Sequence, residues 1–185
     1  MTPAAHRDRR AAPSPWVADM IARLDPLGPE DLRVLDLAAG GGRHARRLLD
    51  LGIAVLAVDR DASGLDRLDG RDGLEILQWD LESGTPWPFA EERFRAVLVV
   101  NYLHRPTLAR TIGLVAPTGH LIYETFGTGN ERCGRPRNPD FLARPHEIAA
   151  AARALGFDIL VDRHLEVETP RPAVLHRCAA FRGVA

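Results

Sequence analysis

At 185 residues the chain has the length of one domain, with enough residues to bury a hydrophobic core. Hydrophobic residues make up 45% of it and charged residues 26%, and the formal net charge of -1 argues against a large nucleic-acid-binding surface, although not against a local basic patch. All 24 basic residues are arginine, which excludes chemistries that need a lysine: Schiff-base catalysis, pyridoxal phosphate enzymes and a Walker-type phosphate loop.

Cysteine and histidine usage indicates no disulfide framework and no metal site. Cys133 and Cys178 lie far apart and form no zinc-type pair, and the histidines show no metal-ligand spacing. No apolar run approaches the roughly 20 residues of a membrane helix, and no hydrophobic signal core follows the charged N-terminus. We therefore expect a protein of the reducing cytoplasm without membrane contact.

The N-terminal part is predicted to be a disordered tail over residues 1–13, followed by a single domain over residues 14–185. Ser14 and Pro15 are typical of a helix start, and apolar residues at helical spacing predict a helix over residues 15–24. From residue 33 onward, short apolar runs alternate with helical patterns. The predicted strands are 33–37, 53–58, 74–78, 95–100, 120–124, 157–167 and 173–181, and the further helices are 43–51, 62–68, 105–116 and 146–155.

This alternation predicts the α/β class, a doubly wound sheet with helices on both faces. The last two strands, 157–167 and 173–181, are joined by a connection too short for a parallel crossover, so we expect them to form an antiparallel hairpin. The predicted architecture is therefore a Rossmann-like sheet of seven strands, mostly parallel, with a final antiparallel strand.

A glycine loop follows the first strand and precedes a helix, in the segment Val34-Leu-Asp-Leu-Ala-Ala-Gly-Gly-Gly-Arg43. Glycines let the backbone approach a ligand closely, and the free amides of the following helix favour a polar or anionic group. Gly40-x-Gly42-x-x-Ala45 also satisfies the dinucleotide fingerprint, which is a weak signal when taken alone.

Asp36 favours one of the two cofactors that such a loop binds. A carboxylate at the loop entrance would repel a pyrophosphate, whereas S-adenosylmethionine (SAM) carries no phosphate and has a cationic sulfonium and an ammonium group. Asp59, at the end of the second strand, does not discriminate, because a dinucleotide also needs an acid there. Asp80 follows the third strand, although a strand-end Asp alone is often only a helix N-cap.

The pattern Asp36-x-Ala38-x-Gly40-x-Gly42 resembles motif I of class I SAM-dependent methyltransferases, with Ala38 where many members have glycine. The resemblance covers about residues 30–182. It implies the strand order 3-2-1-4-5-7-6, SAM as cofactor and S-adenosylhomocysteine as product. It also implies a set of cofactor-binding residues: Asp36, Ala38, Gly40, Gly42, Asp59 with its neighbour Arg60 at the ribose hydroxyls, Asp80 at the adenine amino group, Leu81 beside the ring, and Asn101.

The end of the fourth strand, in Val99-Val-Asn-Tyr-Leu-His-Arg-Pro106, corresponds to motif IV of the same family, beside the methyl group that is transferred. The resemblance places Asn101 and Tyr102 at the methionine part of SAM. His104 is the candidate general base, because an unperturbed imidazole titrates near neutrality. The alternative that His104 caps or packs against the next helix stays open.

A long polar segment over residues 127–139 follows the fifth strand and is expected to be a lid or binding loop near the ligand-binding edge of the sheet. Its arginines could hold an anionic acceptor, and the alternative is a solvated loop with structural arginine pairs. The candidate acceptor-binding residues are Glu124, Asn130, Arg135, Arg137 and Asn138.

The Gly-Gly-Gly-Arg-His loop and the chain length are similar to the tellurite-resistance branch of the family, which names no substrate. We expect a methyltransferase acting on a small molecule, because no added RNA- or protein-binding domain is evident. A nucleic-acid or protein acceptor remains possible through the basic patch at residues 132–137. The alternatives are a non-catalytic protein that binds SAM or a nucleotide, and an NAD(P)-dependent oxidoreductase.

Overall fold

A computed structural model describes residues 12–24, 33–89 and 94–184. Most of the expected N-terminal tail lies outside these residues. The chain divides into two compact units, the first reaching to Asp80 and the second beginning at Leu81. Among the described residues, no helix has the length and apolarity needed to cross a membrane.

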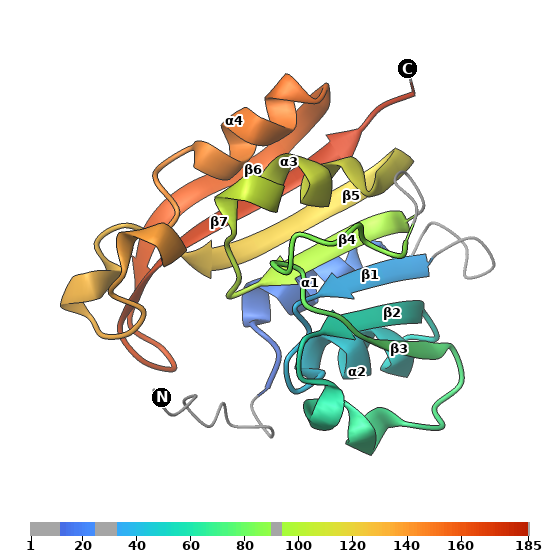
Figure 1. Ribbon diagram of the computed structural model, residues 1–185. Helices are drawn as coiled ribbons and strands as arrows, with labels where there is room; N and C mark the ends of the chain where they lie inside the picture. The colour runs from blue at the N-terminus through green and yellow to red at the C-terminus, as the bar shows by residue number, and fades with distance from the viewer. Residues whose placement is uncertain (1–11, 25–32, 90–93, 185) are drawn as a thin grey trace. The chain divides into compact units, whose positions relative to one another are not determined.

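The seven strands follow the order β3-β2-β1-β4-β5-β7-β6 and are flanked by helices, which confirms the predicted sheet (Figure 1). Strand β7 runs antiparallel to both of its neighbours, and the other described pairs are parallel. The short link between β6 and β7 is the physical reason, because a parallel pair needs a longer crossover.

The first unit holds a three-stranded parallel part of the sheet, with β1 in register with β2 and β2 with β3. Apolar residues of β1 and β2 are buried almost without interruption, as expected for strands covered on both faces. Its elements are α1 (Pro15–Ala22), β1 (Arg33–Leu37), α2 (Arg43–Asp50), β2 (Ala54–Asp59) and β3 (Leu74–Gln78).

The second unit holds the remaining four strands, and α3 and α4 pack against each other on one face of this part of the sheet (Figure 1). Strand β4 is almost wholly buried, whereas β6 alternates because it lies at the edge. The elements are β4 (Phe94–Val100), α3 (Arg105–Gly113), β5 (Val115–Phe126), α4 (Glu147–Ala154), β6 (Phe157–Val167) and β7 (Ala173–Arg182).

Three element predictions are wrong. The helix expected over residues 62–68 is a pair of 3-10 turns, η3 (Ala62–Gly64) and η4 (Asp66–Leu68), because Asp61 caps the first turn and Gly64 lies within it. The third helix ends at Gly113, and β5 begins five residues earlier than expected, at Val115, since the β4–β5 register shifts between Phe94 and Ala96.

His44, in the first turn of α2, is hydrogen-bonded to the residue that caps α1. The ring is 3% exposed, and its Nε2 accepts a hydrogen bond of 3.4 Å from the backbone N–H of Ser14, the N-cap of α1. Burial, reinforced by the charge of Arg43, lowers the pKa of His44 from 6.5 to about 3. The imidazole is therefore neutral when it accepts this bond.

Because the pKa of His44 is lower in the folded chain than in the unfolded one, the folded state loses stability as the pH falls from 6.5 toward 3. We expect His44 alone to lower the free energy of unfolding by about 2 kcal/mol as the pH falls from about 7.5 to about 5. The measurement is urea unfolding of the wild type and of His44→Gln at both pH values. Equal pH dependence in the two proteins would contradict the assignment.

Candidate functional site

The glycine loop after β1 turns through left-handed backbone conformations. Ala38 has φ 59°, Gly40 φ 58° and Gly42 φ 69°. Glycine adopts this region without steric cost, but a residue with a Cβ does not. Position 38 therefore suits glycine by its backbone geometry, and Ala38 occupies it under strain.

Asp36 lies on β1 beneath the loop, and its side chain is used inside the protein. The residue is 1% exposed, and its Oδ2 accepts a hydrogen bond of 3.1 Å from the backbone N–H of Ala45 in the first turn of α2. The amide that could bind a pyrophosphate at this helix end is thus already bound to a carboxylate. A dinucleotide would meet a negative charge here, which favours a cofactor with a cationic part.

Burial raises the pKa of Asp36 from 3.8 to about 7, against the opposing hydrogen bond from Ala45 and the charge of Arg43, while the charge of Asp59 raises it further. The carboxyl group therefore lacks the full compensation that a buried anion needs. A cation bound beside the loop would supply it. The residues present accordingly fit the ammonium and sulfonium charges of SAM.

Asp59 ends β2 with its carboxylate held by backbone amides. Oδ2 accepts from the N–H of Gly40 at 2.7 Å, and Oδ1 accepts from the N–H of Asp61 at 3.0 Å. The side chain thereby joins the strand end to the glycine loop. Each carboxylate oxygen has a further lone pair, so the same group can accept a ribose hydroxyl.

Gly64, in η3, is a residue that sequence reasoning missed. A Cβ at this position would lie 2.5 Å from the carbonyl oxygen of Gly40 and 3.0 Å from Cα of Gly41. Only glycine lets the 3-10 turn pack so closely against the loop. The signal available in the sequence was a glycine in the middle of a predicted helix.

The other predicted cofactor residues lie at the ends of their strands. Arg60 is exposed, and its carbonyl accepts a hydrogen bond of 3.2 Å from Gln78. Asp80 is exposed at the end of the first unit. In the second unit, Leu81 is buried, and its carbonyl accepts from the indole N–H of Trp87 at 3.3 Å.

In the second unit, the segment that follows β4 is tied to β5. Asn101 has φ 57°, and its N–H donates to the carbonyl of Glu124 at 2.8 Å. The hydroxyl of Tyr123 donates to the carbonyl of Tyr102 at 2.9 Å. Tyr123 is buried, which raises its pKa and keeps it a donor. The two predicted methionine-side residues thus lie on a fixed backbone.

Glu124, which is buried, forms an ion pair with a partly buried arginine. Its Oε2 accepts from Nε of Arg177 at 2.7 Å, and the two residues are register partners on β5 and β7. Arg177 had no sequence signal, because 53 residues separate it from Glu124. Glu124 was expected to contact the acceptor, which stays a prediction, and its Oε2 is bound by this arginine.

The loop after β5 contains two 3-10 turns, η5 (Asn130–Arg132) and η6 (Pro139–Phe141). Asn130 is 1% exposed; its amide nitrogen donates to the carbonyl of Pro136, and its oxygen accepts from the N–H of Val174. Asn138 uses its side-chain oxygen to cap η6 at Asp140. Both asparagines expected at the acceptor therefore also shape the loop.

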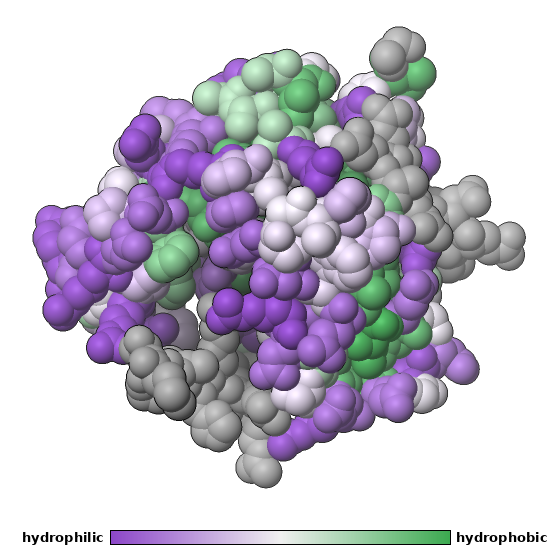
Figure 2. All heavy atoms as spheres, viewed as in Figure 1, coloured by the Kyte–Doolittle hydropathy of each residue, from purple (hydrophilic) through white to green (hydrophobic). Residues whose placement is uncertain are grey.

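Arg135 and Arg137 are exposed in the same loop. Neither guanidinium has a hydrogen-bond or ion-pair partner among the residues that the structure describes, unlike Arg132, which pairs with Glu166 at 2.9 Å. Hydrophilic side chains cover this side of the unit, shown at the left of Figure 2. Two unpaired cations are thus available to an anion at the surface.

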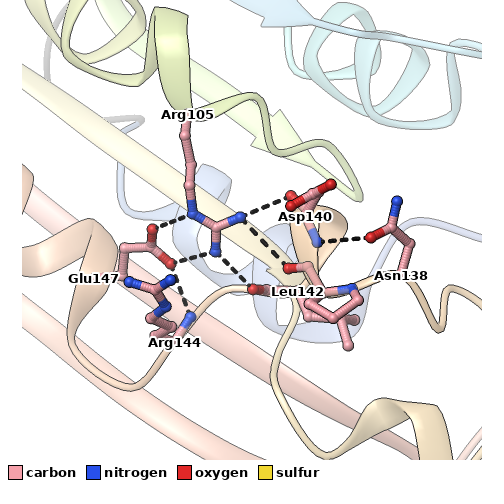
Figure 3. A network of polar contacts seen from close by, with 7 residues as sticks. Arg105, Asn138, Asp140, Leu142, Arg144 and Glu147 are labelled. Carbon is pink, nitrogen blue, oxygen red and sulfur yellow. Dashed lines mark hydrogen bonds and ion pairs between the residues drawn. The ribbon is translucent and has the colours of Figure 1, made fainter.

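Arg105, the first residue of α3, clamps this loop (Figure 3). Its Nε and one terminal nitrogen donate to the two carboxylate oxygens of Glu147, at 2.6 and 2.9 Å. The guanidinium also donates to the carbonyls of Asp140 and Leu142, at 2.8 and 2.9 Å. Burial favours the neutral acid at Glu147, yet the bonds from Arg105 and from the N–H of Arg144 hold its pKa below the usual range.

The chain is similar in sequence to one protein family and in fold to several solved structures. Residues 34–118 match a family model described as a methyltransferase domain. This segment is similar to a methyltransferase domain. It includes the glycine loop, Asp59, Asp80 and the end of β4. The comparison with curated proteins found no match.

Solved structures share the fold at low sequence identity. A SAM-dependent methyltransferase from Mesorhizobium loti is 20% identical, with a TM-score of 0.66, and the match covers 87% of this chain and 96% of that one. A 1,6-didemethyltoxoflavin-N1-methyltransferase from Burkholderia thailandensis, with S-adenosylhomocysteine bound, is 22% identical with a TM-score of 0.64 and coverages of 90% and 77%. The [4+2]-cyclase SpnF is 16% identical, with a TM-score of 0.69, and the match covers 97% of this chain and 86% of that one.

The fold of the chain is thus that of SAM-dependent methyltransferases, as the sequence predicts. The match with the cyclase is a reminder that a shared fold does not by itself establish a reaction. The acceptor has to be argued from the residues of the site.

Replacing Arg105 by Gln should free the loop. The variant loses the Glu147 ion pair and most carbonyl contacts, and hydrogen bonds from a charged donor of this kind contribute roughly 1.5–3 kcal/mol each when partly buried. We expect faster amide hydrogen exchange over residues 139–147. The matched control is Arg110→Gln on the same helix, where the exposed guanidinium lies over the Trp87 ring. Equal exchange in both variants would contradict the clamp.

Proposed function

We propose that the chain is an active SAM-dependent methyltransferase that methylates a small anionic acceptor. One observation carries the cofactor half of this proposal: Asp36 is buried beneath the glycine loop and occupies the N-terminal amide of α2 with its own carboxylate. This arrangement disfavours a pyrophosphate and therefore an NAD(P)-dependent oxidoreductase.

SAM supplies a methyl group on a cationic sulfur, whose carbon–sulfur bond breaks toward sulfur as the acceptor bonds to carbon. The negative charge of Asp36 attracts the cationic part of SAM. The backbone conformations of Ala38, Gly40 and Gly42 let the loop approach the cofactor closely. Asp59, already oriented by two amides, accepts the ribose hydroxyls. The further cofactor contacts that we propose are those implied by the family resemblance, at Arg60, Asp80, Leu81 and Asn101.

The acceptor half of the proposal depends on the second unit. Arg135 and Arg137 are exposed cations without a described partner, so they suit a carboxylate or phosphate on the acceptor. Tyr102 and His104 follow β4, where the family has its acceptor-side motif. A small acceptor is supported by the relative from Burkholderia thailandensis, whose structure holds 1,6-didemethyltoxoflavin.

Two finer predictions remain proposals. The Gly-Gly-Gly-Arg-His loop supports a place near the tellurite-resistance branch, and the distant cysteines support a cytoplasmic location. The second candidate function is a protein that binds SAM without transferring a methyl group. It is favoured by the structural likeness to a cyclase and by the engagement of Glu124 with Arg177.

Calorimetric titration with SAM, S-adenosylhomocysteine and NADH tests the cofactor. We expect SAM to bind and NADH not to bind. Because the pKa of Asp36 is raised to about 7 and the cation binds its carboxylate form, SAM affinity should be about tenfold higher at pH 8 than at pH 6. Asp36→Asn keeps the oxygen that accepts from Ala45 but should lose this pH dependence. Binding of NADH alone would refute the cofactor assignment.

A turnover assay tests the acceptor. The formation of S-adenosylhomocysteine is measured with small carboxylates and phosphates and with their neutral esters. We expect anionic compounds to react, and the double variant Arg135→Gln/Arg137→Gln to raise KM at least tenfold, since each lost charged contact is worth roughly 1.5 kcal/mol or more. Arg153→Gln, an exposed arginine on α4, is the control. Turnover of neutral compounds alone would contradict the anionic acceptor, and SAM binding without any turnover would favour the second candidate.

A further inference from the structure

His104 and Thr107 form a closed pair at the start of α3. His104 is the N-cap residue, and Thr107 lies one turn further along the helix. The ring Nδ1 of His104 lies 2.9 Å from the hydroxyl oxygen of Thr107. The same hydroxyl donates to the backbone carbonyl of His104 at 3.3 Å, and the N–H of Thr107 donates to that carbonyl at 3.2 Å.

The number of protons in this pair decides the state of the ring. A threonine hydroxyl has one proton and can accept through its lone pairs. That proton has two acceptors within reach, the carbonyl of His104 at 3.3 Å and Nδ1 at 2.9 Å. When it is directed to the carbonyl, the contact with Nδ1 requires that Nδ1 carries the hydrogen. A neutral imidazole with hydrogen on Nδ1 has its lone pair on Nε2.

The environment leaves Nε2 available. His104 is only partly buried, and no residue within the described ranges lies at hydrogen-bonding distance from Nε2. The backbone of this segment is held on both sides, by Asn101 and Tyr102 bonded to β5 and by Arg105 in its clamp. The ring is therefore attached to a backbone that is fixed next to the position expected to face the acceptor.

We propose that Thr107 is a positioning residue that holds His104 in the Nδ1–H tautomer, so that Nε2 takes the proton that the acceptor loses on methylation. This inference rests on the proposed methyltransferase function. When the acceptor X–H reacts, the electron pair of its X–H bond stays with X, and the proton passes to Nε2. The imidazolium then returns the proton to water. The acceptor class follows: a hydroxyl, thiol or amine whose proton must leave, rather than an atom without one.

The tautomer of His104 is measurable without SAM or an acceptor. Long-range 1H–15N correlation spectra of the 15N-labelled chain, at a pH where the ring is neutral, distinguish a protonated Nδ1 from a protonated Nε2. The signal that disappears in His104→Gln identifies the residue. Thr107→Val removes the hydroxyl from a side chain of similar shape, and Thr107→Ser keeps it.

We expect the wild type and Thr107→Ser to show hydrogen on Nδ1, and Thr107→Val to shift toward hydrogen on Nε2. Hydrogen on Nε2 in the wild type would overturn the proposal, because the hydroxyl would then donate to the ring. An unchanged tautomer in Thr107→Val would overturn the role of Thr107. A thermal unfolding curve for each variant confirms that the spectra come from folded protein. Failure here leaves SAM binding intact, whereas failure of the proposed function appears in the SAM titration.

Discussion

The contact on which the cofactor half of the site depends is the bond from the carboxylate of Asp36 to the first turn of α2. A charge buried at 1% exposure needs compensation, and a single amide at 3.1 Å supplies only part of it. The remaining deficit raises the pKa to about 7, which is the basis for the proposal that a cation binds beside the loop. Asp59 complements it by holding the amide of Gly40, so two acids shape one glycine loop from two strands.

The second unit uses an arginine where the first uses acids. Arg105 satisfies carbonyls of the loop after β5 and the carboxylate at the start of α4 in one cluster. Since it directly follows His104, the same residue that holds the loop also fixes the start of α3. The proposed acceptor side is thus held by hydrogen bonds, and Arg135 and Arg137 are exposed there. The expectation of a lid over residues 127–139 stays a prediction, and the clamp is the contact that such a movement would have to break.

Much of the fold was predictable because it depends on local patterns. Buried strands such as β1 and β4 appear as apolar runs, and the short β6–β7 link permits only an antiparallel pair. The helix expected at residues 62–68 failed because close packing of Gly64 against Gly40 outweighs the helical spacing of the leucines. The early start of β5 was not visible, because a register shift depends on the neighbouring strand.

By itself, the sequence determined the class of fold, the glycine loop and the acids at the strand ends, since these follow from periodicity and from spacing along the chain. Only the tertiary structure decided how those residues are used. In the folded chain, Asp36 is hydrogen-bonded to Ala45, Glu124 is paired with Arg177, and Arg105 is paired with Glu147. The physical reason is that hydrogen bonds and ion pairs join residues far apart in the chain, 53 positions in the case of Glu124 and Arg177, and their partners compete for the same oxygens. A spacing in the sequence shows which groups are present, but not which of them are already bound.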